Sequence, residues 1–181
     1  MYDGLAKTGN SQRRFHGPSV KEFFSTAKPE MVIELGGWDG EMANLILPDN
    51  DDVVSWTNFE LASVAQVCND DRYDFFVSTD DWAWNHPGFS GDCFVSSHSI
   101  EHVSVDNVKS ILSRLDEEFF SSAFIQAPIP VKGKPNWERW KNSGHIIQCN
   151  MSELDEMFTD HGWTLRMSSR RGSDQIRGWV R

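Results

Sequence analysis

The stretch from Met31 to Leu47, MVIELGGWDGEMANLIL, places the strongest constraint on the fold. A run that is apolar except for Glu34 leads directly into a cluster of three glycines, and a helical pattern of apolar residues follows. A buried strand that ends in a tight turn and continues into a helix has this order. Glycines let the backbone approach a ligand closely, and the first turn of a helix offers unpaired N–H groups with a partial positive charge. The stretch therefore predicts a strand, a turn and a helix that suit a nucleotide-like ligand.

Strand-like and helix-like patterns alternate along the rest of the chain. Four further strands are predicted at Val53–Phe59, Tyr73–Ser78, Asp92–Ser97 and Phe119–Gln126. Helices are predicted at Val20–Ala27 with Ser19 as its N-cap, at Leu61–Cys68, at Val105–Leu115, and from a Ser152–Asp155 capping box to His161. Two last strands, Trp163–Met167 and Gln175–Val180, are expected to be joined by a hairpin-like connection. Since parallel neighbours need crossover connections, this alternation predicts a doubly wound α/β fold, with a mostly parallel sheet and helices on both faces.

The length of 181 residues suits one domain with a substantial core. We expect residues 1–18 to be a flexible N-terminal arm and residues 19–181 to form a single domain. No apolar run approaches the roughly 20 residues that span a bilayer, and the N-terminus lacks a signal-peptide core. We therefore expect a cytoplasmic protein without a membrane partner. The three cysteines have no CxxC spacing, so the sequence indicates neither a disulfide framework nor a cysteine zinc site.

The formal net charge of −10 argues against binding to duplex nucleic acid, because neutralising phosphates requires a basic face. A small basic segment lies between Ala127 and His145. That segment favours an RNA substrate and the total charge opposes one, so a small-molecule acceptor is the expected partner. The sequence indicates no oligomeric state.

The order acid-x-Gly-x-x-x-Gly begins at Glu34 and uses Gly36 and Gly40, and a second acid, Glu60, ends the next apolar run. This arrangement resembles the class I S-adenosylmethionine-dependent methyltransferases. In that family the first acid and the glycines hold the methionine part of the cofactor, and the second acid binds the ribose hydroxyls. The resemblance implies these roles for the four residues. It also implies that the seven-stranded sheet ends in a C-terminal antiparallel hairpin, as in that family.

The chain departs from the family at one position. Trp38 stands where most members have a middle glycine, beside an additional glycine at Gly37 that we include in the predicted cofactor site. Two other interpretations remain open for this stretch. The glycines can simply make an ordinary turn, or the stretch can belong to a nicotinamide-dependent oxidoreductase, which also has an acid about 20 residues further on. The segment GGWDGE does not supply the Gly-x-Gly-x-x-Gly of that class.

The resemblance extends the expected cofactor site beyond the glycines. In the family, an acid just after the third strand commonly contacts the adenine amino group. Asp80 or Asp81 has this place here, and Trp82 can flank the ring. Leu61 and Ser97 complete the predicted cofactor site. The alternative is that the two acids only cap a loop or a helix.

The segment from His98 to His102, HSIEH, resembles part of the ubiquinone-pathway O-methyltransferases and of the small-RNA 2′-O-methyltransferases. Their Glu-x-x-Glu-His segment holds a divalent metal that binds the substrate hydroxyls. Here Glu101 and His102 match, whereas His98 replaces the first Glu. A later Gly144-His145 resembles a Gly-His pair of related small-molecule enzymes. If the three histidines and Glu101 converge, their chemistry suits Zn²⁺ or another transition metal better than Mg²⁺.

Methyl transfer needs a nucleophile aligned behind the methyl group, and positioning alone can supply much of the rate. The alternative to a metal is that His98 or His145 acts as a general base, since an unperturbed histidine has a pKa of about 6.5. Glu101 and His102 can also merely cap and orient a helix. We predict an enzyme that transfers a methyl group from S-adenosylmethionine to an oxygen or nitrogen of a small molecule. A non-catalytic module that binds the same cofactor is the other open interpretation.

Overall fold

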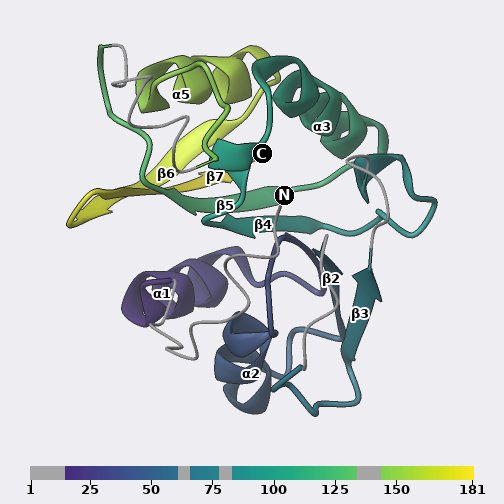
Figure 1. Ribbon diagram of the computed structural model, residues 1–181. Helices are drawn as coiled ribbons and strands as arrows, with labels where there is room; N and C mark the ends of the chain where they lie inside the picture. The colour runs from purple at the N-terminus through teal and green to yellow at the C-terminus, as the bar shows by residue number, and fades with distance from the viewer. Residues whose placement is uncertain (1–14, 61–65, 78–82, 134–143) are drawn as a thin grey trace.

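The computed structural model describes residues 15–60, 66–77, 83–133 and 144–181 and contains one seven-stranded sheet (Figure 1). The strands are β1 (Met31–Leu35), β2 (Ser55–Glu60), β3 (Tyr73–Val77), β4 (Cys93–Ser97), β5 (Ser122–Ala127), β6 (Thr164–Arg171) and β7 (Asp174–Val180). Their spatial order is β3-β2-β1-β4-β5-β7-β6. The first five strands are parallel, and β7 runs antiparallel to both of its neighbours. The predicted doubly wound sheet with a C-terminal antiparallel hairpin is confirmed.

Helices cover both faces of this sheet. One face carries α1 (Gly17–Ala27) and α2 (Glu41–Ile46), and the other carries α3 (Val105–Glu117) and α5 (Met151–Asp160), so Figure 1 shows the two pairs on opposite sides of the strands. The described part of the chain also contains the short 3₁₀ turns η1 (Leu47–Asp49), η2 (Ala83–Asn85) and η3 (Ile100–His102). Every residue of the central strands β4 and β5 is buried, as expected for strands covered on both faces. Among the described residues, no helix is both long enough and apolar enough to cross a bilayer.

Both predicted helix caps are wrong. The first helix starts at Gly17, and Pro18 lies in its first turn, where a missing N–H costs nothing. Ser19 is therefore inside the helix, and its Oγ lies 2.8 Å from His16 Nδ1. The helix thus begins three residues before the predicted start at Val20, and Pro18 supplies a helical φ in its first turn.

The helix α5 has its capping box two residues before the predicted one. Asn150 Oδ1 accepts from the Glu153 backbone N–H at 3.0 Å, and Glu153 Oε2 accepts from the Asn150 N–H at 2.8 Å. Asp155 instead pairs with the buried Arg177 of β7, whose Nε lies 3.2 Å from its carboxylate. A polar residue followed three positions later by an acid occurs twice in this segment, so spacing alone does not select the pair. The acid of the predicted box ties the helix to the sheet.

The C-terminal hairpin is longer and tighter than expected. Most of the predicted connection SRRGSD, Ser169–Asp174, belongs to the strands, and only Gly172 and Ser173 form the turn. Gly172 has φ 60°, a left-handed conformation that glycine adopts without strain.

Arg72 closes the loop that leads from η1 into β2. Its guanidinium donates to the backbone carbonyls of Asn50 and Val53 at 2.9 and 3.0 Å and also to that of Leu47. Its ion pair with Asp70, at 2.7 Å, holds the pKa of that carboxyl down at about 2, chiefly through the hydrogen bonds from Arg72. One side chain therefore satisfies three carbonyls that have no strand partner.

Replacing Arg72 with alanine is expected to lower the free energy of unfolding by about 2–3 kcal/mol, because several carbonyls lose a charged donor. Urea denaturation followed by tryptophan fluorescence measures this change. Lys21→Ala is the matched control, since Lys21 makes a solvent-exposed ion pair with Asp49 at 3.2 Å. Its loss should change stability by no more than about 0.5 kcal/mol. Equal effects of the two variants would contradict the role given to Arg72.

Candidate functional site

The glycine turn follows β1 at the edge of the sheet where the parallel strands end, the edge at which doubly wound folds bind ligands. Gly36 and Gly40 have φ values of 71° and 79°, which strain any other residue type. The Gly36 N–H donates to the Phe59 carbonyl at 2.8 Å, so the turn is anchored to β2. A Cβ on Gly40 would lie 2.6 Å from the Tyr73 hydroxyl. Both glycines are therefore required by the shape of this turn.

Gly37 closes the turn over the buried carboxyl of Glu34. A Cβ at this position would overlap that carboxyl, and the Gly37 N–H donates to Asn58 Oδ1 at 2.9 Å. Glu34 is 1% exposed, and Trp56 Nε1 donates to its Oε2 at 2.8 Å. Burial raises the pKa of Glu34 to about 8 against the lowering effect of the Trp56 hydrogen bond, and the charges of nearby acids add to the rise. Glu34 is therefore mostly protonated at neutral pH.

Trp38 occupies the left-handed conformation that a glycine would adopt more easily, with φ 53°. Its backbone N–H donates to Glu60 Oε2 at 3.0 Å, and its carbonyl accepts from Asn58 Nδ2 at 3.3 Å and from Gln66 Nε2 at 3.1 Å. Three side chains thus hold the residue in place. These hydrogen bonds explain how the turn keeps its conformation although a tryptophan stands at the middle-glycine position.

Asn58 is a residue that the sequence reasoning missed. It is fully buried on β2 and bonds to the two successive backbone units of Gly37 and Trp38. The signal that could have found it is the two-residue period of a strand, which puts Asn58 on the same buried face as Trp56, where an amide must find partners.

The remaining predicted cofactor residues fall into two groups. Glu60 is the last residue of β2 and contacts the glycine turn, and Ser97 is the last residue of β4 and is 6% exposed. Beyond Ser97, the Ser99 hydroxyl donates to the Gly36 carbonyl at 3.0 Å and so joins the loop after β4 to the turn. The predicted contacts of Leu61, Asp80, Asp81 and Trp82 lie outside the described residues.

Three of the four predicted metal ligands come together. Glu101, His102 and His145 each offer a ligand atom, and these atoms lie within 4.8 Å of one another. Glu101 and His102 belong to η3, whereas the sequence pattern predicts them at the start of the next helix, which begins at Val105. The two imidazole rings are 4.9 Å apart.

Local contacts orient this group. Glu101 is 1% exposed, and its Oε2 is buried without a hydrogen-bond partner among the described residues. His102 Nδ1 lies 3.0 Å from the Gly144 carbonyl, so it donates there and the lone pair of the neutral ring lies on Nε2. Burial lowers the pKa of His145, and the neighbouring histidines lower it further against the charge of Glu101. A neutral His145 is the form that binds a metal or accepts a proton.

His98 lies next to this group and outside it. Its Nε2 is 3.0 Å from Asp174 Oδ2, and its Nδ1 is 3.6 Å from Glu101 Oε1. Although burial lowers the pKa of His98, the hydrogen bonds and charges of these two carboxylates raise it above the ordinary value. His98 also has φ 53°, so the backbone is strained to bring the ring to this place.

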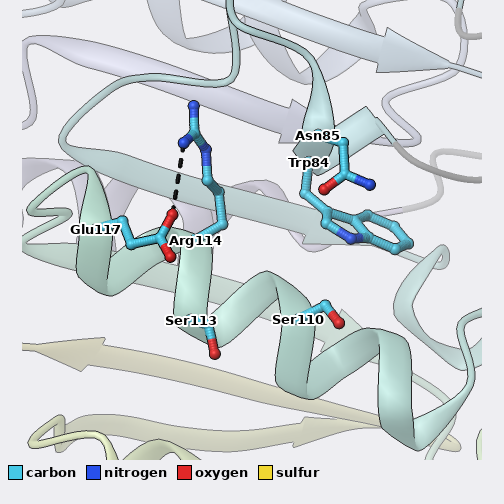
Figure 2. A pocket seen from close by; sticks show the side chains of 6 residues that line it. All are labelled: Trp84, Asn85, Ser110, Ser113, Arg114 and Glu117. Carbon is cyan, nitrogen blue, oxygen red and sulfur yellow. Dashed lines mark ion pairs between the residues drawn. The ribbon is translucent and has the colours of Figure 1, made fainter.

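A separate pocket lies between η2 and α3 and has a volume of about 290 Å³ (Figure 2). Within it, Arg114 Nη1 pairs with Glu117 at 3.6 Å, as the dashed line in Figure 2 marks. Its lining residues are Trp84, Asn85, Ser110, Ser113, Arg114 and Glu117. None of the predicted site residues that the structure describes lines this pocket, so it is distinct from the glycine turn and the histidine group.

No protein-family model and no curated protein sequence matches the chain. Solved structures do match in fold. The methyltransferase domain of bacterial CtHen1-C matches with a TM-score of 0.67 and 14% identity, over 92% of this chain and 97% of that one. The 1,6-didemethyltoxoflavin-N1-methyltransferase of Burkholderia thailandensis matches with a TM-score of 0.68 and 14% identity, over 90% and 76% of the two chains.

Mitomycin 7-O-methyltransferase MmcR matches with a TM-score of 0.62 and 15% identity, over 91% of this chain. The chain spans only 52% of that enzyme's length. The sheet order, the antiparallel hairpin and these matches agree, and the chain therefore has the fold of the class I S-adenosylmethionine-dependent methyltransferases.

Proposed function

We propose that the protein transfers a methyl group from S-adenosylmethionine to an oxygen or nitrogen of a small molecule. The observation that carries this proposal is the glycine turn, which is closed over Glu34 and tied to Glu60 at the carboxyl edge of β1 and β2. A carboxylate can accept from ribose hydroxyls, and we assign this role to Glu60. The turn backbone lies beside it for the methionine part of the cofactor.

The acceptor class is supported by the solved structures with the same fold. Their names describe a mitomycin 7-O-methyltransferase, a 1,6-didemethyltoxoflavin-N1-methyltransferase and a human N-acetylserotonin methyltransferase in complex with SAM. The first name gives an oxygen and the second a nitrogen as the methylated atom, and all three name a small molecule. The negative total charge of this chain agrees with a small acceptor better than with a nucleic acid.

We propose further that Glu101, His102 and His145 hold a divalent transition metal. The fit rests on the buried Glu101 Oε2, which has no partner in the described part of the chain, and on a donor set of two imidazoles and one carboxylate. The hydrogen bond from His102 to the Gly144 carbonyl fixes the ring tautomer, as outer contacts of metal ligands commonly do. A metal held there would supply Lewis acidity toward an acceptor hydroxyl. The chain's own part is to position the acceptor, and His145 is the alternative residue for taking its proton.

The proposed function is tested by calorimetry with S-adenosylhomocysteine. We expect a micromolar dissociation constant, and Glu60→Ala should weaken it by roughly 10–100-fold if hydrogen bonds to a charged acceptor are lost. Glu60→Gln keeps an oxygen for the Trp38 N–H and isolates the effect of the charge. Glu30→Ala is the matched control, because Glu30 is an exposed acid just before β1, at the opposite end of that strand.

The absence of binding at millimolar S-adenosylhomocysteine would exclude the proposed cofactor. Competition by NADH would instead indicate the oxidoreductase class. Transfer of label from tritiated S-adenosylmethionine to small molecules of a cell extract separates an active enzyme from a module that only binds the cofactor.

A further inference from the structure

His98 is held from two sides by carboxylates. Its Nε2 lies 3.0 Å from Asp174 Oδ2, and its Nδ1 lies 3.6 Å from Glu101 Oε1. An imidazole has only two nitrogens, so a ring with both nitrogens directed at protein oxygens has none left for an ion. The position that holds a Glu in the resembled motif therefore does not supply a ligand here.

Asp174, which lies beside His98 Nε2, is held in place by the fold. Asp174 is the first residue of β7, and its Oδ2 also accepts from Gln126 Nε2 at 2.9 Å. Gln126 is 1% exposed on β5, and its backbone carbonyl accepts from the His98 N–H at 2.8 Å. The Ser173 hydroxyl lies 3.3 Å from Asp174 Oδ1. Asp174 is thus an anchored acceptor, and His98 is tied to two neighbouring strands.

The contact of His98 Nδ1 with Glu101 orients the Glu101 carboxylate. Glu101 Oε1 faces His98, whereas Oε2 is buried and has no partner among the described residues. The same Oε1 lies 4.0 Å from His102 Nε2, so it faces His98 on one side and the group of His102 and His145 on the other. A carboxylate oxygen has two lone pairs, so one can face His98 while the other faces an ion. Outer contacts of this kind commonly orient metal ligands.

We infer that Asp174 and His98 form an outer shell that orients Glu101 in the metal site proposed for Glu101, His102 and His145. His98 is a positioning residue in this arrangement and contacts neither the metal nor the acceptor. The inference rests on the proposed metal site and assigns a role to Asp174, a residue that the sequence motif does not contain.

Zinc calorimetry on protein first freed of metal with a chelator tests this role. His98→Ala and Asp174→Ala are each expected to weaken Zn²⁺ binding by roughly 10–100-fold. Asp174→Asn should lose less Zn²⁺ affinity than Asp174→Ala, because the amide oxygen of asparagine still accepts from His98. S-adenosylhomocysteine binding by all three variants should stay within about twofold of the wild type, since the glycine turn is untouched. Thermal unfolding without metal reports whether each variant is folded.

A second carboxylate–histidine pair provides the matched control. Asp116 Oδ2 lies 2.5 Å from His161 Nδ1, near the C-terminal ends of α3 and α5 and outside the proposed metal site. Asp116→Ala removes a contact of the same type and should leave Zn²⁺ affinity unchanged.

Wild-type zinc affinity in His98→Ala would overturn the inference, and so would a wild-type protein that binds no Zn²⁺. If that protein still binds S-adenosylhomocysteine, the proposed methyl transfer survives and only the metal site and its outer shell are lost. Failure of the wild type to bind S-adenosylhomocysteine contradicts the proposed function whatever the zinc result.

Discussion

Between pH 5 and pH 8 the free energy of unfolding of the wild type is expected to fall by about 3–4 kcal/mol because of Glu34, and Glu34→Gln should not show this fall. The pKa of Glu34 is raised by burial from 4.5 to about 8 in the folded protein. Over this range the native state keeps a proton that the unfolded chain has released, so the free energy of unfolding falls by about 1.4 kcal/mol for each pH unit. Glutamine resembles the protonated acid, and its side-chain oxygen can still accept from Trp56.

The measurement is urea denaturation of both proteins at pH 5, 6.5 and 8. The variant should match the wild type at pH 5 and exceed it at pH 8, after the pH effects common to both proteins are subtracted. Glu30→Gln, at an exposed acid, should follow the wild type at every pH. Parallel stability profiles for the wild type and Glu34→Gln would contradict the protonated state assigned to Glu34.

Gly36→Ala should have the second large effect, a loss of about 2–5 kcal/mol together with at least a tenfold loss of S-adenosylhomocysteine affinity. The left-handed backbone costs an alanine about 1–2 kcal/mol, and the new Cβ would overlap the Ser99 side chain, which adds about 1–3 kcal/mol. Moving Ser99 also breaks its hydrogen bond to the Gly36 carbonyl.

Gly133→Ala separates these two costs. Gly133 has φ 81°, and a Cβ added there would meet no atom within 4 Å, so only the backbone cost of about 1–2 kcal/mol applies. Adding Ser99→Gly to Gly36→Ala removes the overlapping atoms and should recover part of the stability. If the two alanine variants lose equal stability, the close approach of Ser99 is unimportant.

The fold was predictable because its local patterns agree with each other. Apolar runs, turn residues and an amphipathic helix alternate from Met31 to Ala127, and parallel strands allow few ways to connect them. Helix ends were less predictable. At α1 no side chain caps the helix, and Pro18 lies in its first turn. At α5 two polar residues compete as caps, and Asp155 pairs with Arg177 instead of closing the second box.

The candidate site was predictable where one local segment forms it. The residues within the turn Glu34–Gly40 are close to one another in sequence, and so are Glu101 and His102. Their spacing therefore indicates each of these two parts of the site. Asn58, Gln126 and Asp174 were missed because they act across the sheet, and a single sequence does not show which strands become neighbours.

Because Asp174 contacts His98, the C-terminal hairpin positions a residue near the proposed metal site as well as closing the edge of the sheet. Asp174 follows a turn of only two residues, and the pairing of Gln126 with Ile176 sets its height beside His98. A side chain on a strand changes face with every one-residue slip. An insertion after Gly172 that shifts this register would therefore turn Asp174 away from His98 while leaving every residue of the glycine turn in place. The length of the hairpin turn therefore sets the position of Asp174 beside His98 and, through His98, the orientation of Glu101 in the proposed metal site.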